Sequence, residues 1–192
     1  MMELLLPMVL ASASPRRQEL LGFYGIPFEV VPSGADETAQ GPGHEQVRVL
    51  ARRKCLDVAS RCPGRLVLAA DTLVCVEDQV LGKPENEQDA LRMLRLLSGR
   101  SHQVHTGICI ACPDGRMIDR VATTRVTFLP VGDDLLRRYI ATGEPMDKAG
   151  AYAIQGRAGA FISSIEGSPT NVIGLPLELL TELFTQLGLP LF

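Results

Sequence analysis

The sequence is poor in several features that would point to a particular class of protein. It has no tryptophan, and aromatic residues make up 5% of its 192 residues. Basic residues are not in excess, because 19 lysines and arginines face 22 acidic residues and give a formal net charge of −3. A broad nucleic-acid-binding surface usually has a strongly basic balance, with aromatic residues interleaved for base stacking. A nucleic-acid-binding module is therefore the least favoured interpretation.

Long apolar runs are also absent, since none approaches the ~18 residues typical of a membrane-spanning helix. The N-terminal segment LLLPMVLASA ends in small residues, as a signal peptide does. However, Glu3 precedes its apolar run without any Lys or Arg, and Pro7 interrupts that run. We therefore expect a cytoplasmic protein with no membrane partner.

The cysteines form no recognisable framework of disulfides or metal ligands. Their number, five, is odd and their spacing is irregular, which in a chain of this size indicates reduced thiols in a cytosolic protein. Cys109 and Cys112 form a single C-x-x-C inside an alternating apolar run, and no second pair or suitably spaced histidine completes a zinc site. We interpret this pair as strand packing.

What the sequence does contain is an alternation of strand-like and helix-like segments. Its 46% of apolar residues and its length allow a sizeable core without a disulfide or a metal. Pro113-Asp114-Gly115 predicts a turn between two strands, which makes that pair antiparallel and the class α/β with a mixed sheet. The expected strands are 8–11, 28–31, 65–76, 103–112, 117–129, 151–154 and 160–165, and the expected helices are 15–24, 44–59, 86–97, 133–141 and 175–187.

The segment LASASPRRQELL runs from an apolar strand directly into two adjacent arginines. Ser14 is a good helix cap and Pro15 suits the first helical position, so Arg16 and Arg17 would lie at the start of a helix. Helix-start amides and arginine side chains both bind phosphate oxygens well. The pattern is typical of an anion-binding site.

Other polar residues interrupt the apolar pattern, and each has an ordinary structural explanation when taken alone. Asp71 in LAADTLV is either a strand-end cap or a metal ligand or general base, and Thr72 would point to the opposite face of the strand. Lys83 follows a short turn in GKP, which is not a Walker A loop. Acidic residues at strand ends, helical Lys54, and Lys148 and Gln155 in DKAGAYAIQG complete the set. Together these residues suit a triphosphate and a divalent cation.

The segments LASASPRRQELL, GADE, RRK, AADT, GKP, LSGRSHQVHTG, GEPMDKAGAYAIQG and NVIGLPL follow one another along the chain. In this order they resemble the Maf family of nucleoside-triphosphate pyrophosphatases (septum formation inhibitor-like). Each segment alone is weakly specific, but the ordered set covers nearly the whole chain. The resemblance implies one Maf-like domain over residues 1–192. Its elongated mixed sheet is flanked by helices and has two lobes with a cleft between them, similar to inosine-triphosphate pyrophosphatase folds.

The resemblance also implies a hydrolase that splits the phosphoric anhydride between the α and β phosphates, with Mg²⁺ or Mn²⁺ as cofactor. Asp71 would be the proton acceptor, assisted by Lys54 and Lys83, and Glu37 with Asp71 would hold the metal. Substrate binding would fall to the remaining candidates, which are Ser12, Ser14, Arg16, Arg17, Thr72, Lys148 and Gln155.

Arg16, Thr72 and Gln155 agree with the thymidine/uridine type of the family, so dTTP and UTP are the expected substrates. A glutamine amide offers both a donor and an acceptor to a pyrimidine edge. Two alternatives remain open: a nucleotide-binding regulator of cell division without significant catalysis, and a pyrophosphatase that prefers modified or purine nucleotides. A homodimer is expected from the family and from the apolar C-terminal helix; the preferred metal and the cellular role are left open.

Overall fold

The computed structural model describes residues 8–190. Residues 4–7 of the apolar segment considered above as a signal peptide therefore lie outside the described residues. The helices are α1 (Pro15–Gly22), α2 (Gly43–Arg61), α3 (Glu87–Leu97), α4 (Asp133–Ile140), α5 (Pro169–Ile173) and α6 (Leu177–Leu187). The strands are β1 (Met8–Leu10), β2 (Phe28–Val30), β3 (Val67–Val76), β4 (Gln79–Leu81), β5 (Ser101–Ala111), β6 (Met117–Phe128) and β7 (Ile162–Glu166). Among these residues, no helix is long and apolar enough to cross a bilayer.

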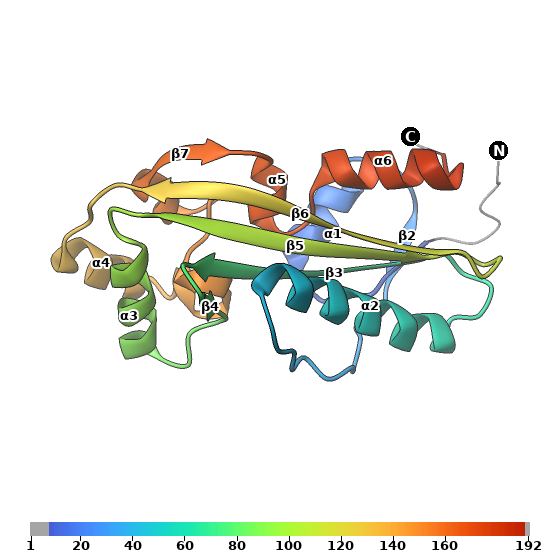
Figure 1. The fold of residues 1–192 in the computed structure, drawn as a ribbon, viewed down its shortest axis with the longest axis horizontal. Helices are drawn as coiled ribbons and strands as arrows, with labels where there is room; N and C mark the ends of the chain where they lie inside the picture. Colours follow the sequence, from blue (N-terminus) through green and yellow to red (C-terminus); the bar gives the residue numbers. More distant parts are fainter. Residues whose placement is uncertain (1–7, 191–192) are drawn as a thin grey trace.

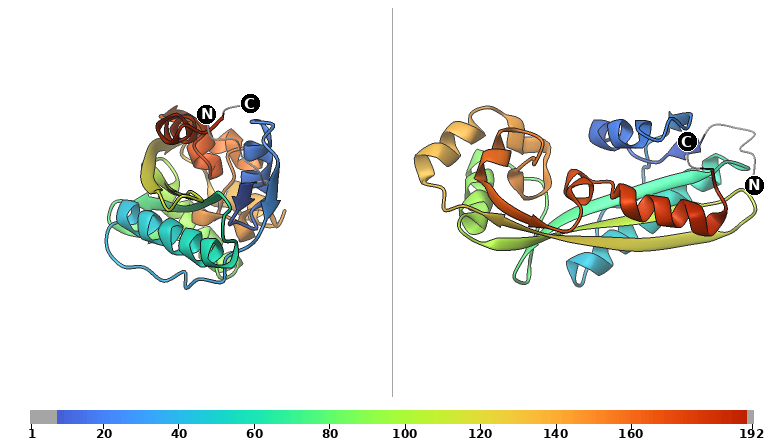
Figure 2. Two further views of the ribbon diagram at one scale, coloured as in Figure 1. Left: turned by 90° about the vertical axis from the view of Figure 1, so that its right-hand side faces the viewer. Right: turned by 90° about the horizontal axis from the view of Figure 1, so that it is seen from above.

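The described strands form one seven-stranded mixed sheet in the order β2-β1-β3-β5-β6-β7, with β4 paired to β3. β1 pairs in parallel with β2 and β3, whereas β5 pairs antiparallel with β3 and β6. The long hairpin of β5 and β6 runs through the length of the molecule, with helices on both faces of the sheet (Figures 1 and 2). The expected mixed α/β class is confirmed.

The two faces of β3 pack against different helices because strand side chains alternate with a period of two. Leu68 and Ala70 lie in the core formed with α1 and α6, whereas Val67 and Ala69 lie in the core formed with α2. α2 approaches the sheet closely at Gly107, where an ideal Cβ atom would lie 2.3 Å from the carbonyl oxygen of Val47. The alternation predicts that residue 71 faces α2 and residue 72 faces α1.

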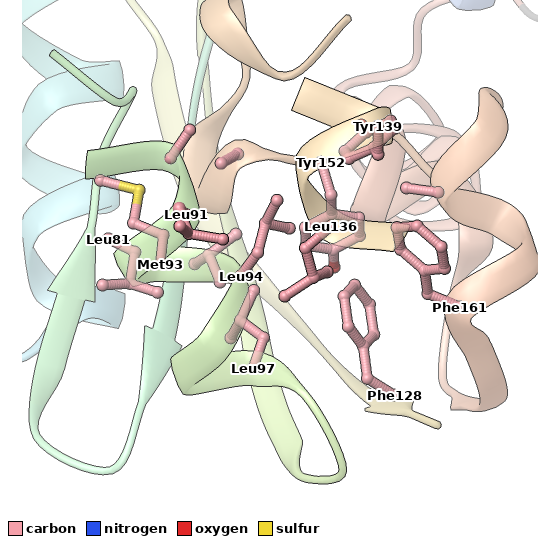
Figure 3. Packing of buried hydrophobic residues seen from close by; sticks show 14 of the residues in the cluster. Leu81, Leu91, Met93, Leu94, Leu97, Phe128, Leu136, Tyr139, Tyr152 and Phe161 are labelled. Carbon is pink, nitrogen blue, oxygen red and sulfur yellow. The ribbon is translucent and has the colours of Figure 1, made fainter. Parts of the chain in front are cut away.

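A further core lies at the other end of the sheet, beneath α3 and α4. Leu94 and Leu97 of α3 and Leu136 of α4 pack there with a group of aromatic rings (Figure 3). Phe128 meets Tyr152 and Phe161 edge-on, with ring centroids 4.9 and 6.3 Å apart. α3 is well capped, because Asn86 accepts a hydrogen bond from the backbone N–H of Asp89. This core supports the loops after α4, which carry part of the site.

Most expected elements are present, but one expected strand is absent and two short elements were not expected. The strand expected at 151–154 is the end of a short 3₁₀ helix (Ala149–Ala151) followed by a turn, because Gly150 and Ala151 adopt positive φ angles of 68° and 59°. No helix was expected at 168–174, but α5 lies there, and its first turn is capped by the Ser168 hydroxyl. The hairpin strand β4 was not expected at all. Short elements like these depend on tertiary contacts rather than on a repeating apolar pattern.

The expected strand packing of Cys109 and the expected turn after it are confirmed. All five cysteines are free thiols, and Cys109 is fully buried in β5, where it packs toward α2. The turn after β5 closes with a hydrogen bond from Gly115 N–H to the Cys112 carbonyl, and Asp114 accepts from the N–H of Arg116. Near the C-terminus, Leu187 and Leu189 are buried in the chain's own core.

Candidate active site

A cleft of about 850 Å³ opens where one edge of β3 lacks a neighbouring strand. β1 pairs with β3 only as far as Leu68, and β4 pairs with it only from Val74 onward. Asp71 and Thr72 lie in the gap between these two pairings and line the cleft. Since their side chains point to opposite faces of the sheet, the open edge exposes both of them to one space.

The start of α1 forms one wall of the cleft. Ser12, Ser14, Arg16 and Arg17 all line it, as expected. Ser14 occupies the N-cap position but its hydroxyl makes no capping hydrogen bond, so this hydroxyl is left for a ligand. Ser12 Oγ accepts hydrogen bonds from Ser14 N and Arg17 Nη1, at 3.3 and 3.1 Å, which leaves its hydroxyl hydrogen to be donated.

Arg17 connects three parts of the chain beneath the cleft. Besides its bond to Ser12, its Nε donates to the Gly174 carbonyl oxygen at 2.8 Å, and its Nη2 donates to Thr72 Oγ1 at 3.0 Å. Burial lowers the pKa of Arg17, and the negative charge of Asp71 acts in the opposite direction. A guanidinium has five N–H donors, so two remain for a ligand after these three bonds within the described residues.

Lys54 of α2 lies between two carboxylates. Its Nζ is 2.7 Å from Asp71 Oδ1 and 2.8 Å from Glu37 Oε1. The side chains of Lys54 and Asp71 are each 12% exposed, whereas that of Glu37 is 70% exposed. The hydrogen bond from Lys54 lowers the pKa of Glu37, and Lys83 and Arg17 add to this effect. Two carboxylates, Glu37 and Asp71, and one ammonium group, Lys54, thus form one cluster although they come from distant parts of the chain.

Further charged side chains make the cleft positive. Lys83 follows β4, and Lys148 forms an ion pair with its neighbour Asp147. Burial lowers the pKa of Arg16, and Asp147 opposes this shift. In total, five basic and three acidic residues line the cleft, a formal excess of two positive charges in a chain whose net charge is −3. This local excess favours a polyanionic ligand.

Gln155 is the one expected site residue that does not line the cleft. It is exposed, in the turn that follows Ala153. Glu144 holds this turn from beneath: its Oε2 accepts from the N–H of Arg157 at 3.2 Å, and its Oε1 would lie 2.2 Å from a Cβ atom on Gly156. Glycine at 156 therefore lets the turn close over Glu144. The role of Gln155 stays a prediction.

Comparison with known proteins shows to which family this chain belongs. Residues 7–187 match the sequence profile described as Maf-like protein. The chain belongs to the Maf-like protein family. A dTTP/UTP pyrophosphatase of Thermococcus gammatolerans is 51% identical over 176 residues, which cover 92% of this chain and 94% of that protein. A dTTP/UTP pyrophosphatase of Symbiobacterium thermophilum is 50% identical over 188 residues, which cover 96% of each chain.

Two solved structures are similar to this Maf-like chain over part of its length. The Staphylococcus aureus Ham1 protein gives a TM-score of 0.47 at 16% identity, over 64% of this chain and 72% of that chain. A nucleoside-triphosphatase / dITP/XTP pyrophosphatase of Mycobacterium abscessus gives a TM-score of 0.41 at 14% identity, over 64% of this chain and 73% of that chain.

Sequence reasoning missed three groups of polar residues around the Maf-like site. Asp147 lines the cleft although only its neighbour Lys148 was expected there. Tyr152 also lines it, and its hydroxyl is 2.8 Å from Nε2 of the buried His102. Thr106 and Asn171 lie beneath the floor and are fully buried. The only feature of the sequence that could have indicated a functional role was the position of these polar residues in apolar surroundings. For Thr106 this indication is weak, because threonine is common in strands.

Proposed function

We propose that this chain hydrolyses dTTP and UTP to the nucleoside monophosphate and pyrophosphate by attack of water at the α phosphorus. The observation that supports this most is the meeting of Arg17, Lys54 and Asp71 in one cleft from three separate segments of the chain. The names of relatives about 50% identical over nearly the full length favour the same substrates.

The cationic side chains would hold the triphosphate. Lys54 uses two of its three N–H donors on Asp71 and Glu37, so the third is left for a phosphate oxygen. Arg17 has two donors left and Ser12 one. Together with Lys83, these groups would neutralise charge that develops on the departing pyrophosphate, which is the main task in phosphoryl chemistry.

Asp71 would orient the attacking water and take its proton. Only Oδ1 is engaged by Lys54, so Oδ2 is left as an acceptor in the described part of the chain. Lys54 also holds the carboxylate in one orientation, which positions that second oxygen. Positioned proton transfer of this kind contributes about 10²–10⁴-fold to the rate.

Glu37 and Asp71 are suited to a magnesium or manganese ion. Within the described residues there is no cluster of three or more acidic, histidine or cysteine ligands. Mg²⁺ is commonly bound through one or two carboxylates together with substrate phosphates and waters, so two carboxylates beside a triphosphate cleft fit that chemistry. When bound, the ion would neutralise phosphate charge and lower the pKa of a coordinated water.

The decisive experiment measures pyrophosphate release from a panel of nucleoside triphosphates by wild type and by Asp71→Asn. We expect wild type to favour dTTP and UTP, and Asp71→Asn to lose about 10²–10⁴-fold in kcat at unchanged folding. The matched control is Asp119→Asn. Asp119 is also a buried aspartate bound to basic residues of α2, but it lies outside the cleft.

Three results would contradict the proposal in different ways. Binding of nucleotides without pyrophosphate release would favour the regulator alternative, and preference for modified or purine nucleotides would favour the other pyrophosphatase. If Asp71→Asn stays within a few-fold of wild type, Asp71 has no role in the chemistry. The cytoplasmic location and the homodimer stay predictions.

A further inference from the structure

A network of hydroxyl and amide groups runs from the cleft floor along the face of the sheet that α5 covers. Thr72 Oγ1 is 2.9 Å from Thr106 Oγ1, and Thr106 donates to the backbone oxygen of Asn171 at 3.0 Å. The Asn171 side chain in turn donates to the Val104 carbonyl oxygen and to Thr124 Oγ1, at 3.0 and 2.9 Å. Thr106 and Asn171 are 0% exposed, so no water competes for these bonds.

The backbone oxygen of Asn171 fixes the direction of the hydroxyl hydrogens of Thr106 and Thr72. A backbone carbonyl oxygen can only accept, so Thr106 must give it its single hydroxyl hydrogen. The contact between Thr72 and Thr106 then needs the hydroxyl hydrogen of Thr72. Thr72 therefore has no hydrogen left to donate into the cleft, and its oxygen is an acceptor there.

The oxygen of Thr72 is the acceptor for Nη2 of Arg17. If the Thr72 hydroxyl were free to rotate, its hydrogen could point at Arg17. Two hydrogen-bond donors, the Thr72 O–H and the Arg17 Nη2–H, would then face each other. Thr106 prevents this by holding the hydrogen on the far side. The Nε bond to Gly174 and the Nη1 bond to Ser12 fix the rest of the guanidinium, so Thr72 completes its orientation at the cleft floor.

We propose that Thr106, which lies outside the cleft, is a positioning residue that orients Arg17 toward the triphosphate by fixing the hydroxyl of Thr72. This inference rests on the proposed pyrophosphatase function. On this account, Thr72 acts through Arg17 and not by donating a hydrogen bond to the substrate. Thr106→Val retains the shape of the side chain but replaces the hydroxyl with a methyl group, whereas Thr106→Ser retains the hydroxyl.

The first test does not depend on activity. The ¹H–¹⁵N NMR signals of the Arg17 guanidinium are assigned by their loss in Arg17→Lys. We expect the Nη signals to broaden or shift in Thr106→Val and to stay as in wild type in Thr106→Ser, while the Nε signal persists in both because it depends on Gly174. Unchanged Nη signals in Thr106→Val would overturn the inference, even if wild type proved inactive and the proposed function failed.

The second test compares dTTP hydrolysis by the same variants. We expect Thr106→Val to lower kcat about tenfold, the effect of about one hydrogen bond, with a smaller change in KM, and Thr106→Ser to restore kcat. Thr124→Val is the matched control, because Thr124 is equally buried and binds Asn171 but does not contact Thr72. An equal loss in Thr124→Val would indicate a general structural effect and overturn the inference. If Thr106→Val does not fold, Thr106→Cys provides the same comparison with a weak donor.

Discussion

Lys54 Nζ and Asp71 Oδ1 lie 2.7 Å apart, although Lys54 belongs to α2 and Asp71 to the middle of β3. Both side chains are only 12% exposed, and Lys54 reaches a second carboxylate, Glu37. A carboxylate inside an apolar strand is unfavourable unless it is paired. The lysine therefore serves the stability of the fold as well as the proposed chemistry.

The two members of this pair are expected to differ in their effect on stability. Lys54→Met leaves Asp71 buried without its cation and should lower the free energy of unfolding by about 3 kcal/mol. Asp71→Asn should cost less, because Lys54 keeps its contact with Glu37. Urea unfolding of both variants and of the double variant measures the difference. A larger loss in Asp71→Asn than in Lys54→Met would contradict this account of the cluster.

Removal of divalent metal with a chelator should abolish dTTP hydrolysis, and Mg²⁺ or Mn²⁺ should restore it. Glu37→Gln retains the size of the side chain but removes the charge, so the metal concentration needed for half-maximal activity should rise about tenfold or more. Glu45→Gln is the control, since Glu45 lies in the first turn of α2 and does not line the cleft. Equal metal dependence in the two variants would exclude Glu37 as a ligand.

Gln155→Glu should selectively weaken turnover of pyrimidine nucleotides. The amide has a donor and an acceptor, whereas a carboxylate only accepts and adds negative charge near a triphosphate. We expect kcat/KM for dTTP and UTP to fall relative to purine triphosphates, and Arg157→Gln, in the same exposed segment, to leave this ratio unchanged. Equal losses for all nucleotides in Gln155→Glu would refute a role in base recognition.

His102 should make the folded state sensitive to acid. Burial lowers its pKa from 6.5 to about 4, so between these values the unfolded chain binds a proton that the folded chain does not. The free energy of unfolding should therefore fall by up to about 3 kcal/mol as the pH drops through this window, with no further loss from this group below it. His102→Gln should flatten the pH dependence measured by urea unfolding, and an unchanged slope in this variant would contradict the assignment to His102.

Local pattern was enough to predict most of the fold. The apolar run of β3, the helical period of α3 and the Pro113-Asp114-Gly115 turn are properties of neighbouring residues, and the structure agrees with each. The strand expected at 151–154 was wrong because Gly150 and Ala151 turn the chain with positive φ angles, a conformation that the apolar pattern does not encode. α5 was missed for a related reason, since its five residues are too few for a helical period.

The sequence by itself determined the chemistry that is available: arginines at a helix start, a carboxylate in a buried strand, and lysines after turns. Only the tertiary structure decided how these groups are used. Where β1 and β4 leave one edge of β3 open, side chains from opposite faces reach the same space, and Lys54 meets both Asp71 and Glu37. The direction of the Thr72 hydroxyl depends on a carbonyl oxygen about 100 residues away in sequence. Hydrogen bonds and ion pairs between distant segments act over a few ångströms, so no pattern of neighbouring residues specifies them.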